Sequence, residues 1–437
     1  MKCINCGTDN KLKDRTANQG RCLKCNHPFV FEPTTMGTVK ITDPMFTKVI
    51  NDISANNTLF FTPKQLLYFL DSRLRKKSFQ SLGFVGSYLF LNIWCTVFFS
   101  NMIFGSRLWL MGNLVYQICV AIYLFNQTNS PKLNNASRKS SARFLQIIGG
   151  LILVIGIFAS MFVVQSFIIF VIIIVIGIFS IFWGTEQLGK VDQLKQEFLI
   201  SPTQLQEWLN RWEQINNVPE KILPSPRQEI TPATINPDVT AYSFDRLVVC
   251  DSANIAKLLI ANNFHFENNC AILSITGYPQ SIFNTTMEML RRNPDLKVYA
   301  IHDCSSKGVS LVHHLRTSEK WFLNSNVAII DLGLLPRQII ASQGKMFTRF
   351  SSQLKDEAKK LSVDIRLTLT AEELAWLDTG NFVELESFTP QKLIQVLRHG
   401  ISGSLNLESD DSSIILIANN DKLVVMAFAE KYQDEFP

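Results

Sequence analysis

Residues 144–183 read FLQIIGGLILVIGIFASMFVVQSFIIFVIIIVIGIFSIFW, a run of 40 positions without a charged side chain. One helix of that length would be about 60 Å long, twice the thickness of a hydrocarbon core of roughly 30 Å. A tight turn at 164–166, where Gln165 and Ser166 interrupt the apolar run, divides it into two helices of about 19 residues each. The stretch therefore predicts a transmembrane helical hairpin.

Two further stretches, 81–104 and 108–126, are also uncharged and long enough to cross a bilayer. The alternative for any one of these runs is a buried helix in a large soluble core. Four such runs in succession argue against that alternative. We therefore predict a four-helix transmembrane bundle over residues 79–184, anchored in the lipid bilayer.

Positive charges flanking the predicted spans give their orientation, because short cytoplasmic segments are enriched in Lys and Arg. From the first flank to the last, the counts are five, one, four, none and two. The residues are Lys64, Arg73, Arg75, Lys76 and Lys77; Arg107; Lys132, Arg138, Lys139 and Arg143; and Lys190 and Lys195. The alternation predicts a multi-pass protein of the inner cell membrane with both termini in the cytoplasm.

The composition excludes several classes of protein. Across 437 residues there are 42 Lys and Arg against 37 Asp and Glu, a net charge of 42 − 37 = +5, which is too small to indicate nucleic-acid binding by itself. A hydrophobic fraction of 47% excludes a disordered chain. The spans contain no ionisable residue, which disfavours transport, and Asn92, Asn113 and Gln117 are expected to hydrogen-bond between helices.

Four cysteines near the N-terminus form two C-x2-C pairs separated by fifteen residues, Cys3, Cys6, Cys22 and Cys25. Four thiolates at this spacing form a closed tetrahedral Zn²⁺ site with a structural role. Two disulfides are the alternative, but they need an oxidising compartment, and the predicted orientation places this segment in the cytoplasm. The segment 1–32 resembles a zinc ribbon, in which we expect a β-hairpin between the two pairs and a closing strand at 29–31.

The segments on either side of the predicted bundle read as amphipathic helices. Residues 43–77 form two short helices, with Thr62 as an N-cap of the second. Residues 185–238 hold a helix with Trp208 and Trp212, then a proline-rich linker. The two tryptophans are expected either at the bilayer surface or packed on the next domain.

From residue 239 to 437 the pattern alternates short β-branched runs with helical ones, which predicts an α/β domain with a mostly parallel sheet. Strands are expected at 247–249, 271–276, 296–301 and 328–331, and a final strand pair at 414–417 and 423–428. Asp251, Gly277, Asp303 and Asp331 follow or end these strands, where the functional groups of parallel sheets gather. His302, His313 and His314 are close in sequence but complete no Cys/His metal set.

Three segments of this domain, VVCDSANIAKLLI, SITGYP and VYAIHDCSSKGVSLVHHL, resemble the toprim domain of type IIB topoisomerase A subunits and related meiotic DNA-breaking proteins. The resemblance implies three carboxylates that hold Mg²⁺ near a phosphodiester. Asp251 corresponds to the first acidic position, displaced by one residue, and Asp303 to the first Asp of D-x-D. Ser305 stands where the second Asp is expected, which weakens such a site. An unrelated Rossmann-like binding domain remains the alternative.

The same relatives carry a winged-helix unit with a nucleophilic tyrosine on a K/R-x-x-x-Y segment. The run from Lys64 to Tyr68 in PKQLLYFLD is similar to it, which makes Tyr68 a candidate nucleophile on DNA. The alternative is packing, because Tyr68 lies at helical spacing within an apolar stripe.

Two functions follow from this sequence. The first is a membrane-anchored cytoplasmic scaffold or sensor that binds nucleic acid or protein through the zinc ribbon and a catalytically degenerate toprim-like domain. The second is a Mg²⁺-dependent nucleic-acid-processing enzyme that uses Asp251 and Asp303. No local pattern identifies a small-molecule substrate, and we expect a non-enzymatic role in the first case.

Overall fold

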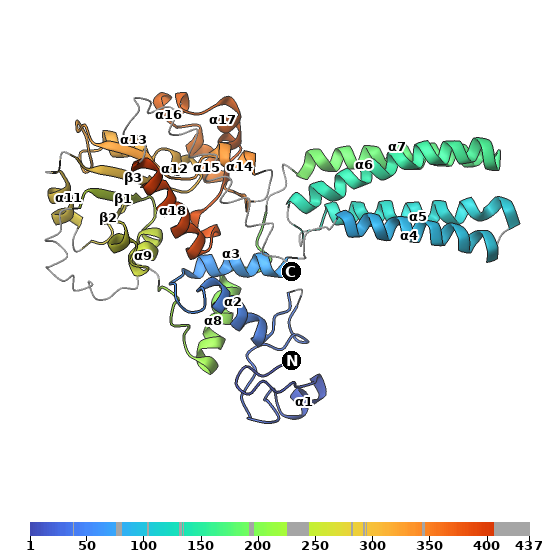
Figure 1. Cartoon of the computed structure of the whole chain (residues 1–437), viewed down its shortest axis with the longest axis horizontal. Coiled ribbons are helices and arrows are strands. Elements are labelled where there is room, and N and C mark those ends of the chain that lie inside the picture. Colours follow the sequence, from blue (N-terminus) through green and yellow to red (C-terminus); the bar gives the residue numbers. More distant parts are fainter. Residues whose placement is uncertain are drawn as a thin grey trace. The chain divides into compact units, whose positions relative to one another are not determined.

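The three-dimensional structure, a computed structural model of the chain, divides it into two compact units (Figure 1). One unit joins Met1–Leu74 with Phe198–Pro437, and the other is Arg75–Glu197. The structure describes residues 1–437 except 38, 76–80, 103–104, 131–132, 134, 192–195, 225–243, 281–282, 292, 294, 343–345 and 406–437. Most of the proline-rich linker and the expected strand pair at 414–428 lie outside the described residues.

The N-terminal segment contains two cysteine turns, each closed by an isolated β-bridge, Lys2 with Asp9 and Arg21 with Pro28. Between the turns lies a short helix, α1 (Leu12–Ala17), so the expected β-hairpin between the cysteine pairs is wrong. The expected closing strand at 29–31 is not formed either. Asp14 explains the helix locally, because its carboxylate accepts a hydrogen bond of 2.9 Å from the backbone N–H of Lys11 and so caps α1.

A small helical subdomain is assembled from segments before and after unit Arg75–Glu197. It consists of α2 (Asp43–Ile53), α3 (Pro63–Leu74) and α8 (Pro202–Asn216). Thr62 caps α3 as expected, since its hydroxyl accepts from Gln65 N–H and Gln65 Oε1 accepts from Thr62 N–H. Trp208 and Trp212 are 4% and 6% exposed and pack against Phe31, in the core that precedes the α/β domain. They are buried as one alternative expected, but not against the next domain.

The α/β domain is built on a four-stranded parallel sheet, which the sequence predicts. The order of its strands is β2-β1-β3-β4. Its strands are β1 (Arg246–Cys250), β2 (Cys270–Ser274), β3 (Lys297–Ile301) and β4 (Ala328–Asp331). A separate antiparallel pair joins β5 (Arg349–Phe350) to β6 (Asn381–Phe382). The helices in the domain are α9 (Ala253–Ala261), α10 (Phe264–Glu267), α11 (Phe283–Arg291), α12 (Ser306–Val309), α13 (Leu311–Thr317), α14 (Pro336–Ala341), α15 (Ser352–Ala358), α16 (Val363–Leu367), α17 (Ala371–Asp378), the short 3₁₀ helix η4 (Leu385–Ser387) and α18 (Pro390–Leu405).

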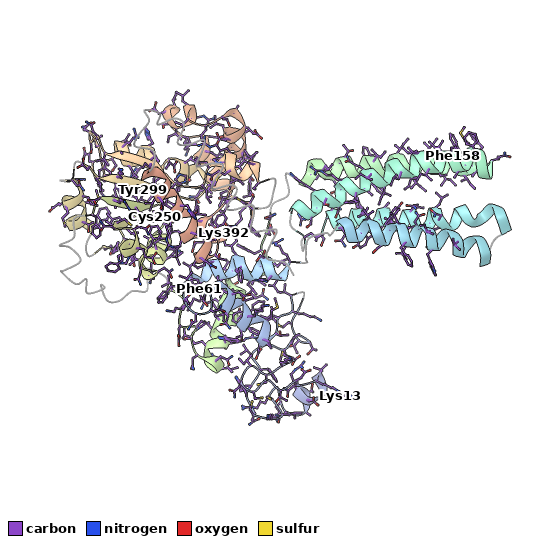
Figure 2. The ribbon with its side chains drawn as sticks, in the orientation of Figure 1. Lys13, Phe61, Phe158, Cys250, Tyr299 and Lys392 are labelled. Atoms are coloured by element: carbon purple, nitrogen blue, oxygen red, sulfur yellow. The ribbon has the colours of Figure 1, made fainter. Side chains whose placement is uncertain are left out.

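Both faces of β1, β2 and β3 are buried, which explains why these strands are mostly apolar instead of alternating, whereas β4 at the edge is less buried. Val248 and Cys250 of β1 belong to one core, together with residues of α9 and α18. Leu247 and Val249 belong to a second core, with residues of α11 and α13. Figure 2 labels Cys250 and Tyr299 of the first core, and both are fully buried.

The unit Arg75–Glu197 holds α4 (Ser81–Met102), α5 (Gly105–Thr128), α6 (Asn135–Phe158), the π-helical turn η1 (Ala159–Val164) and α7 (Phe167–Val191). Among the described residues, two helices are long and apolar enough to cross a membrane, Ser137–Phe162 and Phe167–Lys190. The hairpin turn lies where the sequence predicts it, with Gln165 at φ 51°. Large apolar side chains point outward from this hairpin, such as Phe158 at 61% exposure (Figure 2).

Polar residues of α4 and α5 pair with one another as expected. The Tyr88 hydroxyl donates to Gln117 Oε1 at 2.8 Å, and Asn113 Nδ2 donates to Asn92 Oδ1 at 3.2 Å. These hydrogen bonds satisfy polar groups in an otherwise apolar helix pair.

Glycines allow close contact between α6 and α7. A Cβ atom on Gly149 would lie 2.9 Å from the carbonyl oxygen of Gly177 and 2.8 Å from a side-chain carbon of Ile181. The backbone oxygen cannot move aside without displacing α7. Gly150, the next residue, has open space at its Cβ position.

We therefore predict that Gly149→Val weakens the α6–α7 hairpin by about 1–3 kcal/mol, because overpacking forces the two backbones apart. Gly150→Val is the matched control and is expected to change little. Thermal or SDS-induced unfolding of the full chain in detergent micelles measures the difference. Equal effects of the two substitutions would contradict the prediction.

Candidate functional site

The four cysteines predicted to bind zinc are brought together by the fold. Their sulfur atoms all lie within 4.8 Å of one another, and the Cys3–Cys25 and Cys6–Cys22 pairs are 3.6 Å apart. A tetrahedron with Zn–S bonds of about 2.3 Å has edges of roughly 3.8 Å. The sulfur positions therefore fit a tetrahedral zinc ion, and four protein ligands leave no position open for water.

The turns that carry these cysteines are built by residues with left-handed backbone conformations. Gly7 has φ 72° and Asn26 has φ 57°, and each residue directly follows one of the two pairs. The backbone N–H groups of Cys25 and Lys24 lower the pKa of Cys22 to about 6, although partial burial of its thiol opposes them. A thiol with such a low pKa is readily available as thiolate, the form that binds zinc.

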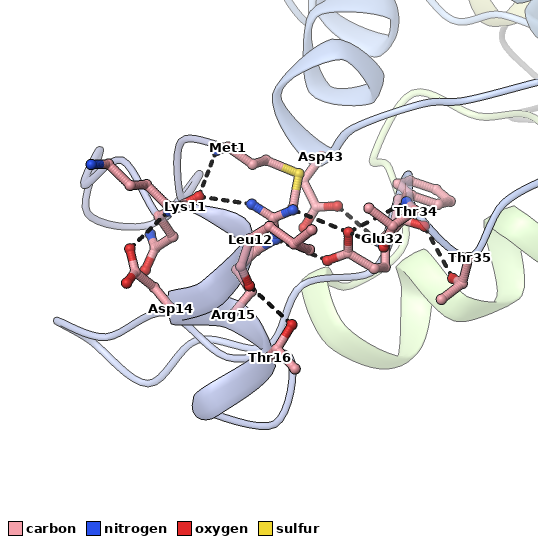
Figure 3. Close-up of polar contacts among 12 residues, drawn as sticks. Met1, Lys11, Leu12, Asp14, Arg15, Thr16, Glu32, Thr34, Thr35 and Asp43 are labelled. Atoms are coloured by element: carbon pink, nitrogen blue, oxygen red, sulfur yellow. Dashed lines mark hydrogen bonds and ion pairs between the residues drawn. The ribbon is translucent and has the colours of Figure 1, made fainter.

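Polar contacts surround the cysteine cluster, and Figure 3 shows those of Arg15, Glu32 and Asp43. Asn10 is fully buried, donates to Cys22 Sγ at 3.5 Å and accepts from Leu23 N–H at 3.0 Å. Arg15 donates to both carboxylate oxygens of Glu32 at 2.8 and 3.0 Å. Asp43, at the start of α2, accepts from the backbone N–H groups of 30 and 31. These residues position the sulfurs indirectly, and no spacing pattern in the sequence marks them.

A second cluster lies at the carboxyl ends of β1 and β3. The strand order reverses between these two strands, and ligands of open α/β sheets bind in the crevice at such a switch point. Asp251 follows β1 and Asp303 follows β3, so the structure brings together the two acidic candidates that lie fifty-two positions apart. Asp331, at the end of β4, lies one strand further along the sheet.

Asp251 and Asp303 are linked through the backbone. Asp251 Oδ2 accepts from Asp303 N–H at 2.7 Å, and Asp303 Oδ1 accepts from Leu385 N–H at 2.7 Å. The other oxygen of Asp251, Oδ1, is buried and has no hydrogen-bond partner among the described residues. Burial raises the pKa of both carboxyl groups, and the charge of Asp251 adds to the rise at Asp303.

Residues from distant segments complete this acidic cleft, which we define as Asp251, Asp303, Glu384 and Glu386. Lys64 of α3 places its Nζ 2.6 Å from Glu384 and 3.5 Å from Glu386. Arg349 of β5 lies 3.3 Å from the other oxygen of Glu384. Protein cations thus pair with Glu384 and Glu386. Among the described residues, only the four N-terminal cysteines gather as a set that could hold a metal ion, so the expected Mg²⁺ site at Asp251 and Asp303 is not supported.

Tyr68 lies one helical turn after Lys64 and points into the same cleft. Its hydroxyl donates to Glu384 Oε2 at 2.5 Å, and its ring packs on Phe198 and Phe347. Burial raises the pKa of Tyr68, and the negative charge of Glu384 raises it further. The phenol is therefore held in its protonated form, the opposite of what an activated nucleophile needs.

Two residues that follow Asp303, Ser305 and Gly308, have structural roles in the start of α12. Ser305 caps α12, because its hydroxyl accepts from Gly308 N–H at 3.0 Å. A Cβ on Gly308 would lie 1.9 Å from the carbonyl oxygen of Asp303, so the turn requires glycine there.

His302 is fully buried beside the cleft and pairs with Asp331, with Nε2 at 3.0 Å from Oδ1. Its Nδ1 lies 2.8 Å from the carbonyl oxygen of Asp303. Burial alone lowers the pKa of this imidazole, but the charge of Asp331 and these hydrogen bonds outweigh it and raise the pKa to about 9. A protonated His302 therefore fixes the turn that carries Asp303.

Sequence reasoning did not identify Glu384, Glu386, Arg349, or the pairing of His302 with Asp331. Glu384 lies eighty-one positions after Asp303 in a segment where no spacing is diagnostic. The one available signal was the acidic pattern E-L-E at 384–386, two carboxylates separated by an apolar residue.

No protein-family model matches this chain, and a search of curated proteins finds no significant match. The toprim resemblance of the C-terminal domain thus rests on the short segments alone.

We predict that the purified protein contains one zinc ion per chain and that Cys22→Ser greatly reduces its zinc content. Three remaining ligands cannot close the tetrahedral site, and structural zinc contributes about 10–16 kcal/mol to the folding of such modules. Metal analysis by mass spectrometry measures the content, with Cys119→Ser as the control. Wild-type zinc content in Cys22→Ser would contradict the assignment.

We also predict a pH-dependent contribution of His302 to stability. A histidine whose pKa is raised on folding contributes fully below its unfolded pKa of about 6.5, and the contribution is lost as the pH rises through about 9. The free energy of unfolding should fall by roughly 3–4 kcal/mol over this interval. Thermal unfolding of the full chain in micelles at several pH values tests it. Asp331→Asn should flatten the dependence of stability on pH in this interval. The same dependence in Asp331→Asn as in the wild-type protein would contradict the prediction.

Proposed function

We propose that this protein is a membrane-anchored cytoplasmic scaffold or sensor, which binds a protein or nucleic-acid partner through its zinc ribbon and its α/β domain. The closed tetrathiolate site supports a structural metal, because zinc catalysis needs an open coordination position. The ribbon also offers exposed side chains beside its cysteine turns, among them Leu23 at 57% exposure.

The observation that carries the proposal is the position of Lys64. Its ammonium group lies between Glu384 and Glu386, whose side chains are 12% and 7% exposed. A catalytic metal cleft of the toprim kind needs its carboxylates free for the ion and the phosphodiester. Here an ammonium and a guanidinium neutralise the cleft from within, which favours binding or signalling over phosphodiester chemistry.

The alternative function is a Mg²⁺-dependent nucleic-acid-processing enzyme that uses Asp251 and Asp303. It is favoured by the resemblance and by the place of both residues at the switch point. It requires Lys64 to leave the cleft before a metal ion binds.

One comparison separates the two functions. A photo-crosslinking residue replaces Leu23 in the full chain, and ultraviolet light is applied to intact membranes, with and without Cys22→Ser or Asp303→Asn. The proposed function predicts a discrete adduct that is lost in Cys22→Ser and kept in Asp303→Asn.

The same preparations are assayed for cleavage of single- and double-stranded DNA and RNA with Mg²⁺ or Mn²⁺. Cleavage that disappears in Asp303→Asn would establish the enzyme instead.

We further propose that α4 and α5 cross the bilayer together with α6 and α7, with both termini in the cytoplasm. The uncharged character of α4 and the alternation of positive charge support four spans. In this arrangement the α4–α5 connection and the turn at Gln165 lie outside the cytoplasm.

Reporter fusions test the four spans. Alkaline phosphatase fused after Ser106 or Gln165 should be active, while a fusion after Ser130 or Lys190 should be inactive, because phosphatase folds only outside the cytoplasm. With two spans alone, the fusion after Gln165 is active and the fusion after Ser106 is not. An inactive Ser106 fusion would therefore reduce the anchor to the α6–α7 hairpin.

A further inference from the structure

Helix α3 covers the acidic cleft through the polar groups of its first two turns. Besides Lys64 and Tyr68, the Thr62 hydroxyl donates to Glu386 Oε1 at 2.8 Å, and Gln65 Nε2 donates to the carbonyl oxygen of Phe388 at 3.0 Å. All of these partners lie within residues 384–388. One short helix is thus held to one short segment by a dense set of hydrogen bonds and ion pairs.

The same helix leads to the membrane unit. It ends at Leu74, the last residue of its own unit before the chain enters Arg75–Glu197. The chain returns at Phe198, and the next residue, Leu199, donates its backbone N–H to Asp71 of α3 at 2.7 Å. Asp71 is fully buried. The hydrogen bond between Leu199 and Asp71 therefore joins the start of the returning segment to α3, the helix from which the outgoing segment continues.

The returning segment also contacts the groups that close the cleft. Phe198 lies 4.9 Å from the Tyr68 ring and 5.0 Å from Phe347, measured between ring centroids. The guanidinium of Arg349 lies over the Phe198 ring at 5.1 Å while it pairs with Glu384. A displacement of Phe198 would disturb both Tyr68 and Arg349, which contact Glu384 together with Lys64.

We propose that α3 and Phe198–Leu199 form a latch that keeps the acidic cleft closed and that is released by movement of the membrane-spanning helices. The inference rests on the bilayer-anchored part of the proposed function. The outgoing connection continues from α3, the helix that carries Lys64 and Tyr68, and the returning connection joins Phe198, whose ring contacts Tyr68. A shift of either connection is thereby transmitted to the cleft without a long chain of intermediaries.

The charges of the cleft are suited to reversible opening. The Lys64 side chain is already 38% exposed, so its ammonium reaches water by a small movement of the side chain. Opening also admits water to Asp251 Oδ1, which lacks a hydrogen-bond partner among the described residues. Hydration of these groups offsets the loss of the ion pairs, because the cost of removing two charges from water can exceed their mutual attraction.

Amine labelling of the full chain in nanodiscs tests the latch. An acetylating reagent is applied briefly, and mass spectrometry compares the labelling rate of Lys64 with that of Lys48, an exposed lysine on α2. Nanodiscs of short-chain and long-chain phosphatidylcholine change the bilayer thickness and thereby the tilt of spanning helices. Tyr68→Phe removes one contact of the latch, and Tyr123→Phe is its control on α5.

In the closed state, Lys64 should react about tenfold more slowly than Lys48, which corresponds to only ~1.4 kcal/mol of protection. One of the two bilayers should bring the Lys64 rate closer to that of Lys48. Tyr68→Phe should raise the Lys64 rate in both bilayers, whereas Tyr123→Phe should not. An unchanged Lys48 rate shows that exposed amines react equally in all samples, and an unchanged thermal unfolding midpoint shows that each variant remains folded.

Two results would overturn the latch. Lys64 rates equal to those of Lys48 in every sample would mean that the cleft is not closed. Protected Lys64 with the same rate in both bilayers would mean that the membrane helices do not control it. A failure of the anchoring proposal appears separately, because a protein that does not insert will not co-purify with the nanodiscs.

Discussion

The fold depends on one constraint, which is that the chain leaves a folded unit at Leu74 and must return to the same unit at Phe198. Residues before and after this excursion pack into one core, where Trp212 lies against Phe31 and Phe46. A pair of backbone hydrogen bonds of 2.9 Å joins Phe61 to Lys221 and Leu223 across the same gap in sequence. Neither Met1–Leu74 nor the segment that begins at Phe198 can bury its apolar face alone, so the two pack together. This packing fixes the position of α3.

The position of α3 then decides the electrostatics of the switch point. Four carboxylates lie at the cleft, and burial of Asp251 and Asp303 raises their pKa values. Buried charges need partners, and α3 supplies one to Glu384 and Glu386 through Lys64. The cleft therefore gathers several carboxylates, and the cation beside Glu384 and Glu386 is the ammonium group of Lys64. The same arrangement gives Tyr68 a structural role in which its hydroxyl is bound to Glu384.

The zinc cluster and the acidic cleft differ in how far the sequence alone could lead to them. The zinc ligands lie within twenty-three residues, and a tight turn forces each C-x2-C pair to aim both sulfurs at one point. Local spacing therefore carries most of the geometry. The sequence did not indicate a role for Asn10, because a single asparagine in a polar loop carries no pattern. Its burial and its hydrogen bonds exist only in the folded turn. The expected hairpin failed for a similar reason, since the cap at Asp14 favoured a helix.

The sequence by itself determined the zinc cysteines, the apolar hairpin with its turn at Gln165, and the parallel sheet with acidic residues at its strand ends. Each of these depends on interactions between residues close in the chain, or on a repeating apolar pattern. Only the tertiary structure decided that Lys64 meets Glu384, that His302 pairs with Asp331, and that Trp208 is buried. Lys64 and Glu384 are 320 positions apart, and no local propensity relates them. Their contact exists because the segments before and after Arg75–Glu197 pack into one subdomain, which places α3 against residues 384–388.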